Sequence, residues 1–101
     1  MEQLKKHTGL WIDKKIIDSN LTALEMLVLS DIMTICKNNN NKYIKLNSTI
    51  SSMWNISIRT VNNIMMSLKT KELIYIRNTT YVDSFKKKRT IIPNWDEINK
   101  L

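Results

Sequence analysis

ISSMWNISIRTV, residues 50–61, contains one short predicted helix, a tight turn and the start of a second predicted helix. The apolar residues of its first half are spaced i, i+3, i+4, which predicts a helix of about two turns with one buried face. Those residues are Ile50, Met53 and Trp54. Asn47 or Ser48 precedes them and can cap the first turn with its side chain.

The turn is predicted at Asn55, because asparagine tolerates left-handed backbone better than other non-glycine residues. Ile56 is expected to pack beneath this turn. Ser57 then stands where an N-cap is needed, which predicts another helix over residues 58 to about 69.

This second helix has two different faces. Its apolar residues lie on one face about 120° wide, and they are Ile58, Val61, Ile64, Met65 and Leu68. The outward face offers hydrogen-bonding groups and no acid: Arg59, Thr60, Asn62, Asn63, Met66, Ser67 and Lys69.

Two strands are predicted after this helix, over residues 73–77 and 89–92, as an antiparallel pair. The polar tip between them, residues 78–88, ends in a basic run, Lys86-Lys87-Lys88, with Arg89 after it. Pro93 is expected to end the second strand and Asn94 to cap a last turn of helix.

A long helix is predicted before the decisive stretch. Thr22 and Glu25 form a capping box, so the helix is expected to begin there and to end near Lys37. It is apolar almost all round, which predicts either a central helix or a subunit interface. Asp31 falls on an apolar face and is therefore expected to be paired or to lie at the helix's exposed edge, without a catalytic role.

The remaining segments give weaker signals. Residues 9–12 are predicted to be an edge strand or an extended arm, residues 14–19 a connector, and residues 43–46 a short strand. A homodimer is a separate hypothesis, motivated by the second apolar face of the long helix and by Trp11 and Trp95.

The positive charge is concentrated in one part of the chain. The net charge is +7, and residues 37–89 contain eleven Lys or Arg against only Glu72 and Asp83. Such a patch attracts polyanions, of which nucleic acid is the commonest. The alternative is an ordinary solvated surface in a lysine-rich chain.

Composition excludes several classes of protein. A chain of 101 residues predicts one domain, and a single cysteine excludes an internal disulfide. A single glycine argues against phosphate-binding loops, so no nucleotide cofactor is expected. No nucleophile with a base, metal cluster or carboxylate dyad is recognised, so we expect no enzyme, no metal and no other cofactor.

The chain's location is predicted from its apolar segments. No run reaches the roughly 20 apolar residues of a membrane span, and the lysines near the start precede no signal core. We therefore expect a cytoplasmic protein with no membrane partner. Cys36 is interpreted as a packed apolar side chain, and His7 as a solvated one.

The order of these elements, with residues 50–61 continuing through Ile64, Leu68 and Leu73, resembles the winged helix-turn-helix family. The branch it resembles is found in bacterial, plasmid and phage regulators and in the N-terminal domains of replication initiators. Residues 56–61 match that branch's apolar-Ser-x-Arg-Thr-Val opening of the recognition helix. The resemblance spans roughly residues 10–92.

The resemblance implies an α+β fold with a three-helix core and a two-stranded β wing, besides the short N-terminal strand. It divides the chain into a tail over residues 1–9, a domain over residues 10–93 and a tail or short helix over residues 94–101. Ser51 stands where the family favours alanine, and Asn55 and Glu72 stand where it favours glycine. Glu72 is expected to reshape the approach to the wing or to let the helix run on.

The resemblance also implies how double-stranded DNA would be bound. The helix over residues 57–69 would enter the major groove, with Arg59 on guanine, and Asn62 or Asn63 on adenine. Ser57 and Thr60 would face phosphate oxygens. The other implied DNA contacts are Met66 on the helix and, on the wing, Arg77, Lys86, Lys87, Lys88 and Arg89.

Three functions are open at this point. The favoured one is a small transcriptional regulator with no enzymatic activity, and the same domain could serve a plasmid or phage replication initiator. The third is a winged helix that docks an acidic protein and binds no DNA.

Overall fold

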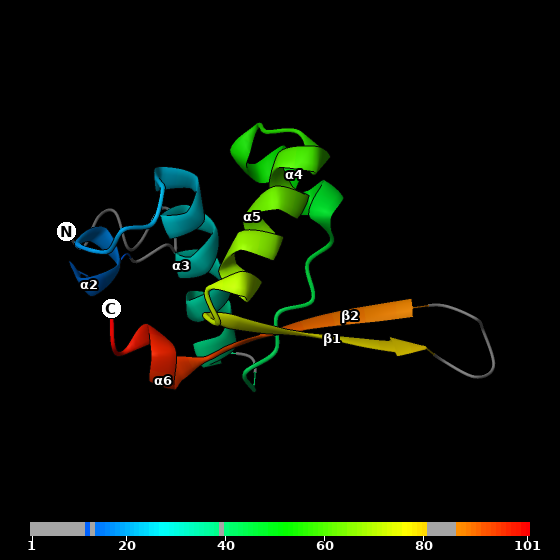
Figure 1. Cartoon of the computed structure of the whole chain (residues 1–101). Helices are drawn as coiled ribbons and strands as arrows, with labels where there is room; N and C mark the ends of the chain where they lie inside the picture. Colours follow the sequence, from blue (N-terminus) through cyan, green and yellow to red (C-terminus); the bar gives the residue numbers. More distant parts are fainter. Residues whose placement is uncertain (1–11, 13, 39, 81–86) are drawn as a thin grey trace.

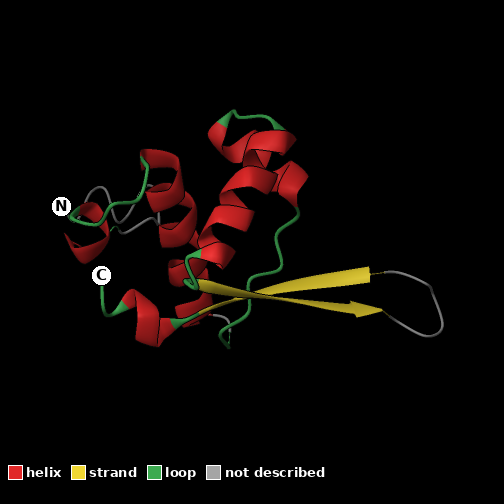
Figure 2. Ribbon diagram, viewed as in Figure 1, coloured by secondary structure: helices red, strands yellow, loops and turns green. Residues whose placement is uncertain are grey.

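Five helices and a two-stranded antiparallel sheet make up the residues that the computed structural model describes, which are 12, 14–38, 40–80 and 87–101. The fold is therefore of mixed α+β class (Figures 1 and 2). In chain order the elements are α2 (Lys14–Ile17), α3 (Ala23–Asn38), α4 (Asn47–Trp54), α5 (Ile58–Thr70), β1 (Ile74–Thr80), β2 (Lys87–Pro93) and α6 (Trp95–Ile98).

Helix α3 begins at the predicted capping box. The backbone N–H of Thr22 donates to Glu25 Oε1 at 2.9 Å, and the N–H of Glu25 donates to Thr22 Oγ1 at 3.2 Å. These two bonds satisfy backbone donors that the first turn of a helix leaves without partners. The prediction of a helix from this point to about Lys37 is confirmed, since α3 ends at Asn38.

Helix α3 is buried on both of its apolar faces. Val28, Leu29 and Ile32 are fully buried, and Met33 and Cys36 are nearly so. The second apolar face therefore packs inside a single chain and does not need a second subunit to cover it. Asp31 is paired as predicted, because it accepts from the Tyr43 hydroxyl at 2.7 Å and lies 3.1 Å from Lys45 Nζ.

The turn between α4 and α5 has the predicted geometry. Asn55 is left-handed at φ 54° and ψ 49°, and the N–H of Ile56 donates to the carbonyl of Ser51 at 3.0 Å. Ser57 caps α5 by accepting a hydrogen bond from the N–H of Thr60 at 3.0 Å. The left-handed residue satisfies the last carbonyls of α4, and Ser57 satisfies the first donors of α5.

Two expectations for α4 are wrong. Its N-cap is Leu46, with no side-chain hydrogen bond, and neither Asn47 nor Ser48 caps it, because Asn47 is already the first helical residue. Met53 is 43% exposed, and its sulfur lies 3.3 Å from Lys45 Nζ. An eight-residue helix packed mainly on α5 buries only a narrow stripe, and Ile50 is its only fully buried residue.

Helix α5 buries its predicted face, with one exception. Val61, Ile64, Met65 and Leu68 are buried, whereas Ile58 is 51% exposed because it stands in the first turn, beyond the edge of the core.

Helix α5 ends in a Schellman motif. The N–H of Leu73 donates to Leu68 O at 3.0 Å and that of Glu72 to Lys69 O at 2.9 Å, with Glu72 left-handed at φ 63°. A glycine-like position is thus occupied by glutamate, and the helix stops at Thr70 instead of running on.

The predicted hairpin is present and longer than expected. Its register pairs Ile74 with Pro93 and Ile76 with Ile91, and Pro93 is the last residue of β2, as predicted. Figure 1 shows the hairpin extending from the helices on the side away from α2 and α6.

The strand expected over residues 43–46 is reduced to one bridge. Tyr43 exchanges two backbone hydrogen bonds with Ile91, at 3.0 and 2.8 Å. The pairing stops there because the carbonyl of Lys45 accepts from the guanidinium of Arg89 at 2.7 Å instead of from a strand.

Near the start of the described residues the structure differs from the prediction, whereas near their end it agrees. Residues 14–17 form α2 rather than a connector, since the fully buried Ile16 anchors this turn in the core. Of the arm expected over residues 9–12, only Ile12 lies within the described residues, and it is half-buried against the core. Asn94 caps α6 as predicted, accepting from the N–H of Glu97 at 3.5 Å.

Candidate nucleic-acid interface

The exposed face of α5 is a polar stripe. Arg59, Asn62, Asn63 and Met66 are all exposed, and their spacing places them on one side of the helix. Helix α5 contains no acidic residue. The stripe defined by these four residues therefore presents a guanidinium, two amides and a thioether to a partner without a repelling carboxylate on the same helix.

Ser57 and Thr60 are used by the helix itself. Besides the capping bond, the two hydroxyls share a hydrogen bond of 2.8 Å. Ser57 is exposed and Thr60 half-buried at the N-terminal end of α5. The hydroxyl of Ser57 can still turn toward a phosphate, at the expense of its bond to Thr60.

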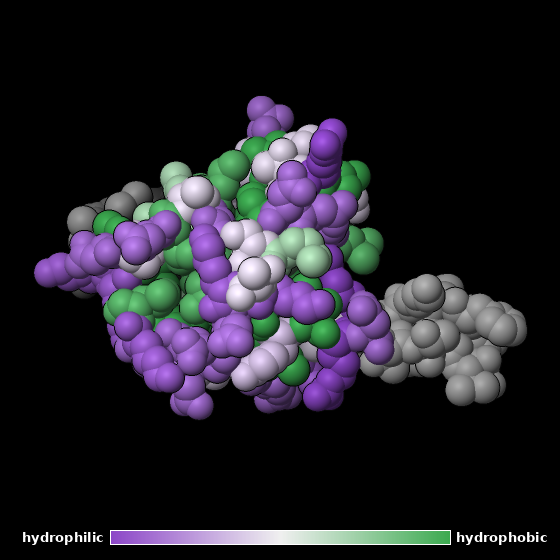
Figure 3. Space-filling view, viewed as in Figure 1, coloured by the Kyte–Doolittle hydropathy of each residue, from purple (hydrophilic) through white to green (hydrophobic). Residues whose placement is uncertain are grey.

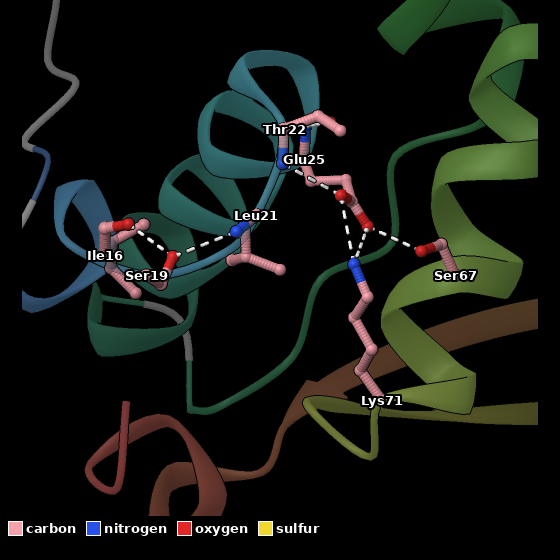
Figure 4. A network of polar contacts seen from close by, with 7 residues as sticks. All are labelled: Ile16, Ser19, Leu21, Thr22, Glu25, Ser67 and Lys71. Atoms are coloured by element: carbon pink, nitrogen blue, oxygen red, sulfur yellow. Dashed lines mark hydrogen bonds and ion pairs between the residues drawn. The ribbon is translucent and has the colours of Figure 1, made fainter.

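Ser67 does not face outward, contrary to expectation. It is half-buried, and its hydroxyl donates to Glu25 Oε2 on α3, as Figure 4 shows. The same carboxylate receives Lys71 Nζ at 2.9 Å while it caps α3. This Glu25 cluster, which consists of Thr22, Glu25, Ser67 and Lys71, holds the C-terminal half of α5 against the start of α3.

The cluster changes the acidity of Glu25. Burial of this side chain, 4% exposed, raises its pKa. Hydrogen bonds from Ser67, the backbone of Thr22 and Lys71 outweigh that effect, so the pKa falls from 4.5 to about 2. The carboxylate therefore stays ionised down to strongly acidic pH. Sequence analysis found its capping role but not its contacts with α5.

Arg89 is placed differently from the expected phosphate contact. It is half-buried on β2, opposite Asn78 of β1, where Nη1 donates to Asn47 Oδ1 and Nη2 donates to the carbonyl of Lys45. Burial lowers its pKa. Arg89 thus joins β2 to the start of α4, and it was assigned to DNA only because it continues the basic run in sequence.

Asn47 connects this point to α5, because its Nδ2 donates to Asn62 Oδ1. No sequence signal indicated this pair, since the two residues are 15 positions apart on different helices. The α5 stripe is therefore linked to Arg89 on β2 through α4.

The other hairpin residues that the resemblance implies as DNA contacts are described only in part. Arg77 is exposed on β1, opposite Thr90. Lys87 and Lys88 belong to β2 by their backbone, and their side chains lie outside the described part of the structure. Lys86 lies outside the described residues altogether.

Cys36 is packed in the core, as the sequence suggested. It is 3% exposed, and burial raises the pKa of its thiol to about 11. Within residues 12, 14–38, 40–80 and 87–101, no group of three or more His, Cys, Asp or Glu side chains could hold a metal ion. In the same part of the chain, no helix combines the length and the apolar character that crossing a membrane requires.

Comparison with known protein families and with curated proteins finds no match for this chain.

Proposed function

We propose that the protein is a winged helix-turn-helix that binds double-stranded DNA with sequence preference, as a small transcriptional regulator. In this proposal α4, the Asn55 turn and α5 form the helix-turn-helix, and β1 with β2 forms the wing. The protein acts by binding and carries out no chemical step.

One observation carries the proposal: the acid-free α5 stripe is exposed, while the opposite face of α5 is fixed in the core. A recognition helix needs both properties, because base edges are read only by side chains held in a fixed orientation. Only three residues separate the end of α5 from the start of the hairpin, so a wing would lie beside the helix on the same duplex.

The chemistry of the stripe fits base edges and phosphates. Arg59 can donate two hydrogen bonds to guanine O6 and N7, and an asparagine amide can pair with adenine N6 and N7. Arg77 would contact the phosphate backbone from the wing, together with Lys86, Lys87 and Lys88. Figure 3 shows hydrophilic residues interspersed with hydrophobic ones on the near face of the molecule.

Fluorescence anisotropy with a mixed-sequence duplex tests the proposal. Arg59→Ala is expected to weaken binding by about fivefold or more, since a bidentate guanine contact is worth about 1–3 kcal/mol. Lys14→Ala removes the same charge from exposed α2, away from the α5 stripe, and is the matched control.

Equal effects of the two substitutions would mean that net charge alone drives binding. No binding by the unmodified protein at low salt, where attraction is strongest, would overturn the proposal. A pull-down for an acidic protein partner would then be the next experiment.

A further inference from the structure

A continuous chain of hydrogen bonds runs from the hairpin to the α5 stripe. Arg89 on β2 donates to Asn47 Oδ1 at the start of α4, and Asn47 Nδ2 donates to Asn62 Oδ1 on α5. Arg89 is itself fixed by the carbonyl of Lys45, 2.7 Å from Nη2. Of the residues in this series of hydrogen bonds, only Asn62 belongs to the exposed α5 stripe.

The chemistry of arginine decides which atom donates and which accepts in each of these hydrogen bonds. A guanidinium has five donors and no acceptor, so Asn47 can meet Arg89 only with its carbonyl oxygen. The amide nitrogen of Asn47 is then left to face α5, and as a donor it requires the oxygen of Asn62. The orientation of both amides therefore follows from Arg89.

Asn62 is consequently left with its Nδ2 donors for an outside partner. The bidentate contact of asparagine with adenine needs the amide oxygen and nitrogen to face the base together. Asn62 Oδ1 already accepts from Asn47 and is held toward α4, so we expect this bidentate contact to be disfavoured at Asn62. Asn63 has no hydrogen bond to another described residue through its side chain, and both ends of its amide are available.

Resting on the proposed function, we infer that Asn62 is a specificity residue that donates to guanine, whose O6 and N7 present two adjacent acceptors where thymine presents only O4 beside a methyl group. Arg89 and Asn47 are positioning residues that set this preference without touching the base. Of the two asparagines, Asn63 is then the one with both ends of its amide available for adenine. The preference against cytosine follows because its N4 amino group is a donor and meets another donor.

The decisive variant is Asn47→Asp, which exchanges donor and acceptor in the hydrogen bond between residue 47 and Asn62. A carboxylate still accepts from Arg89 but can no longer donate, so Asn62 must turn its amide nitrogen toward α4 and its oxygen outward. The base preference at that position should then change from guanine toward cytosine or adenine, by about fivefold or more.

Selection of binding sites from a randomised duplex library, at one fixed salt concentration, measures the preference at every base pair. Asn62→Ala identifies the base pair concerned, because its preference should be lost there and kept elsewhere. Ser48→Asp is the matched control: Ser48 is exposed in the same first turn of α4, so it adds the same charge without touching the chain of bonds. Far-UV circular dichroism checks that each variant folds.

Asn47→Ala is the second variant if the aspartate fails to fold. It releases the Asn62 amide, so guanine preference should fall and adenine should become tolerated at that base pair. Preferences in Asn47→Asp and Asn47→Ala identical to those of the unmodified protein would overturn the inference and leave DNA binding intact. No binding by the unmodified protein would overturn the proposed function first, and the inference with it.

Discussion

Glu25 stabilises two separate parts of the molecule with one carboxylate. One of its oxygens caps α3 through Thr22, and both lie within hydrogen-bonding distance of Lys71 beyond the end of α5. Although Glu25 itself is only 4% exposed, it is held by charge-assisted hydrogen bonds from Thr22, Ser67 and Lys71, and loss of its charge weakens all of them. The relative placement of α3 and α5 therefore depends on an ionised Glu25.

Stability should fall in acid because of this residue. Its pKa is about 2 in the folded chain against 4.5 ordinarily, so the stabilisation is complete above about pH 5 and is lost as the pH falls toward 2. The shift corresponds to about 3 kcal/mol. Urea unfolding of the unmodified protein and of Glu25→Gln should differ by roughly this amount at about pH 6 and converge near pH 2. A constant difference at both pH values would contradict this role.

The sequence predicts one half of what Glu25 does. Thr22 is three residues away, so the capping box is visible as a local pattern. Ser67 and Lys71 are 42 and 46 residues away, and their meeting with Glu25 depends on how α5 packs on α3. The partners of Arg89 and Asn62 are invisible in the sequence for the same reason, since Asn47 lies 42 and 15 residues away from them.

Helices α4 and α5 are each followed by a left-handed residue that is not glycine. Asn55 has φ 54° and Glu72 has φ 63°. Asparagine tolerates this backbone, whereas glutamate is held in it by the Schellman bonds at the end of α5. The turn at Asn55 and the end of α5 near residue 69 were predictable, whereas the left-handed conformation of Glu72 was not.

Replacing Glu72 with glycine should stabilise the fold. The left-handed conformation costs a side-chain-bearing residue roughly 1 kcal/mol, which glycine does not incur. We expect Glu72→Gly to raise the free energy of unfolding by about 1 kcal/mol, and Asn55→Gly to raise it by less. Thermal unfolding of the two variants measures both changes. A gain at Asn55 larger than at Glu72 would contradict the explanation.

Substituting the two arginines of the hairpin should have different effects, one on stability and the other on DNA binding. Arg89→Ala removes charged hydrogen bonds to Asn47 and to the carbonyl of Lys45, and should cost about 1.5–3 kcal/mol of stability. Arg77→Ala, at an exposed position, should leave stability unchanged and lower the salt dependence of DNA binding by about one phosphate contact. Urea unfolding and salt titrations measure the two effects. Equal stability of the two variants would contradict the role given to Arg89.

At the scale of the whole molecule, the reasons for expecting a homodimer have changed. The second apolar face of α3 is buried within one chain. Trp95 donates to Asn41 at 2.9 Å and has Lys37 5.8 Å from its ring centre. Trp11, the remaining motive, lies outside the described residues.

The homodimer therefore stays a prediction for light scattering. It requires a mass of twice 11.9 kDa at tens of micromolar, with or without DNA. It also predicts DNA half-sites about one helical turn apart, or a multiple of that. A monomeric mass under both conditions would contradict it.

Backbone amide NMR spectra of the labelled protein, recorded as a DNA duplex is added, show which part of the fold contacts DNA, because every described element reports separately. The largest shifts are expected in the exposed α5 stripe and along β1 and β2, while α2 and α6 change little. Shifts confined to α2 and α6, or none at low salt, would contradict this expectation.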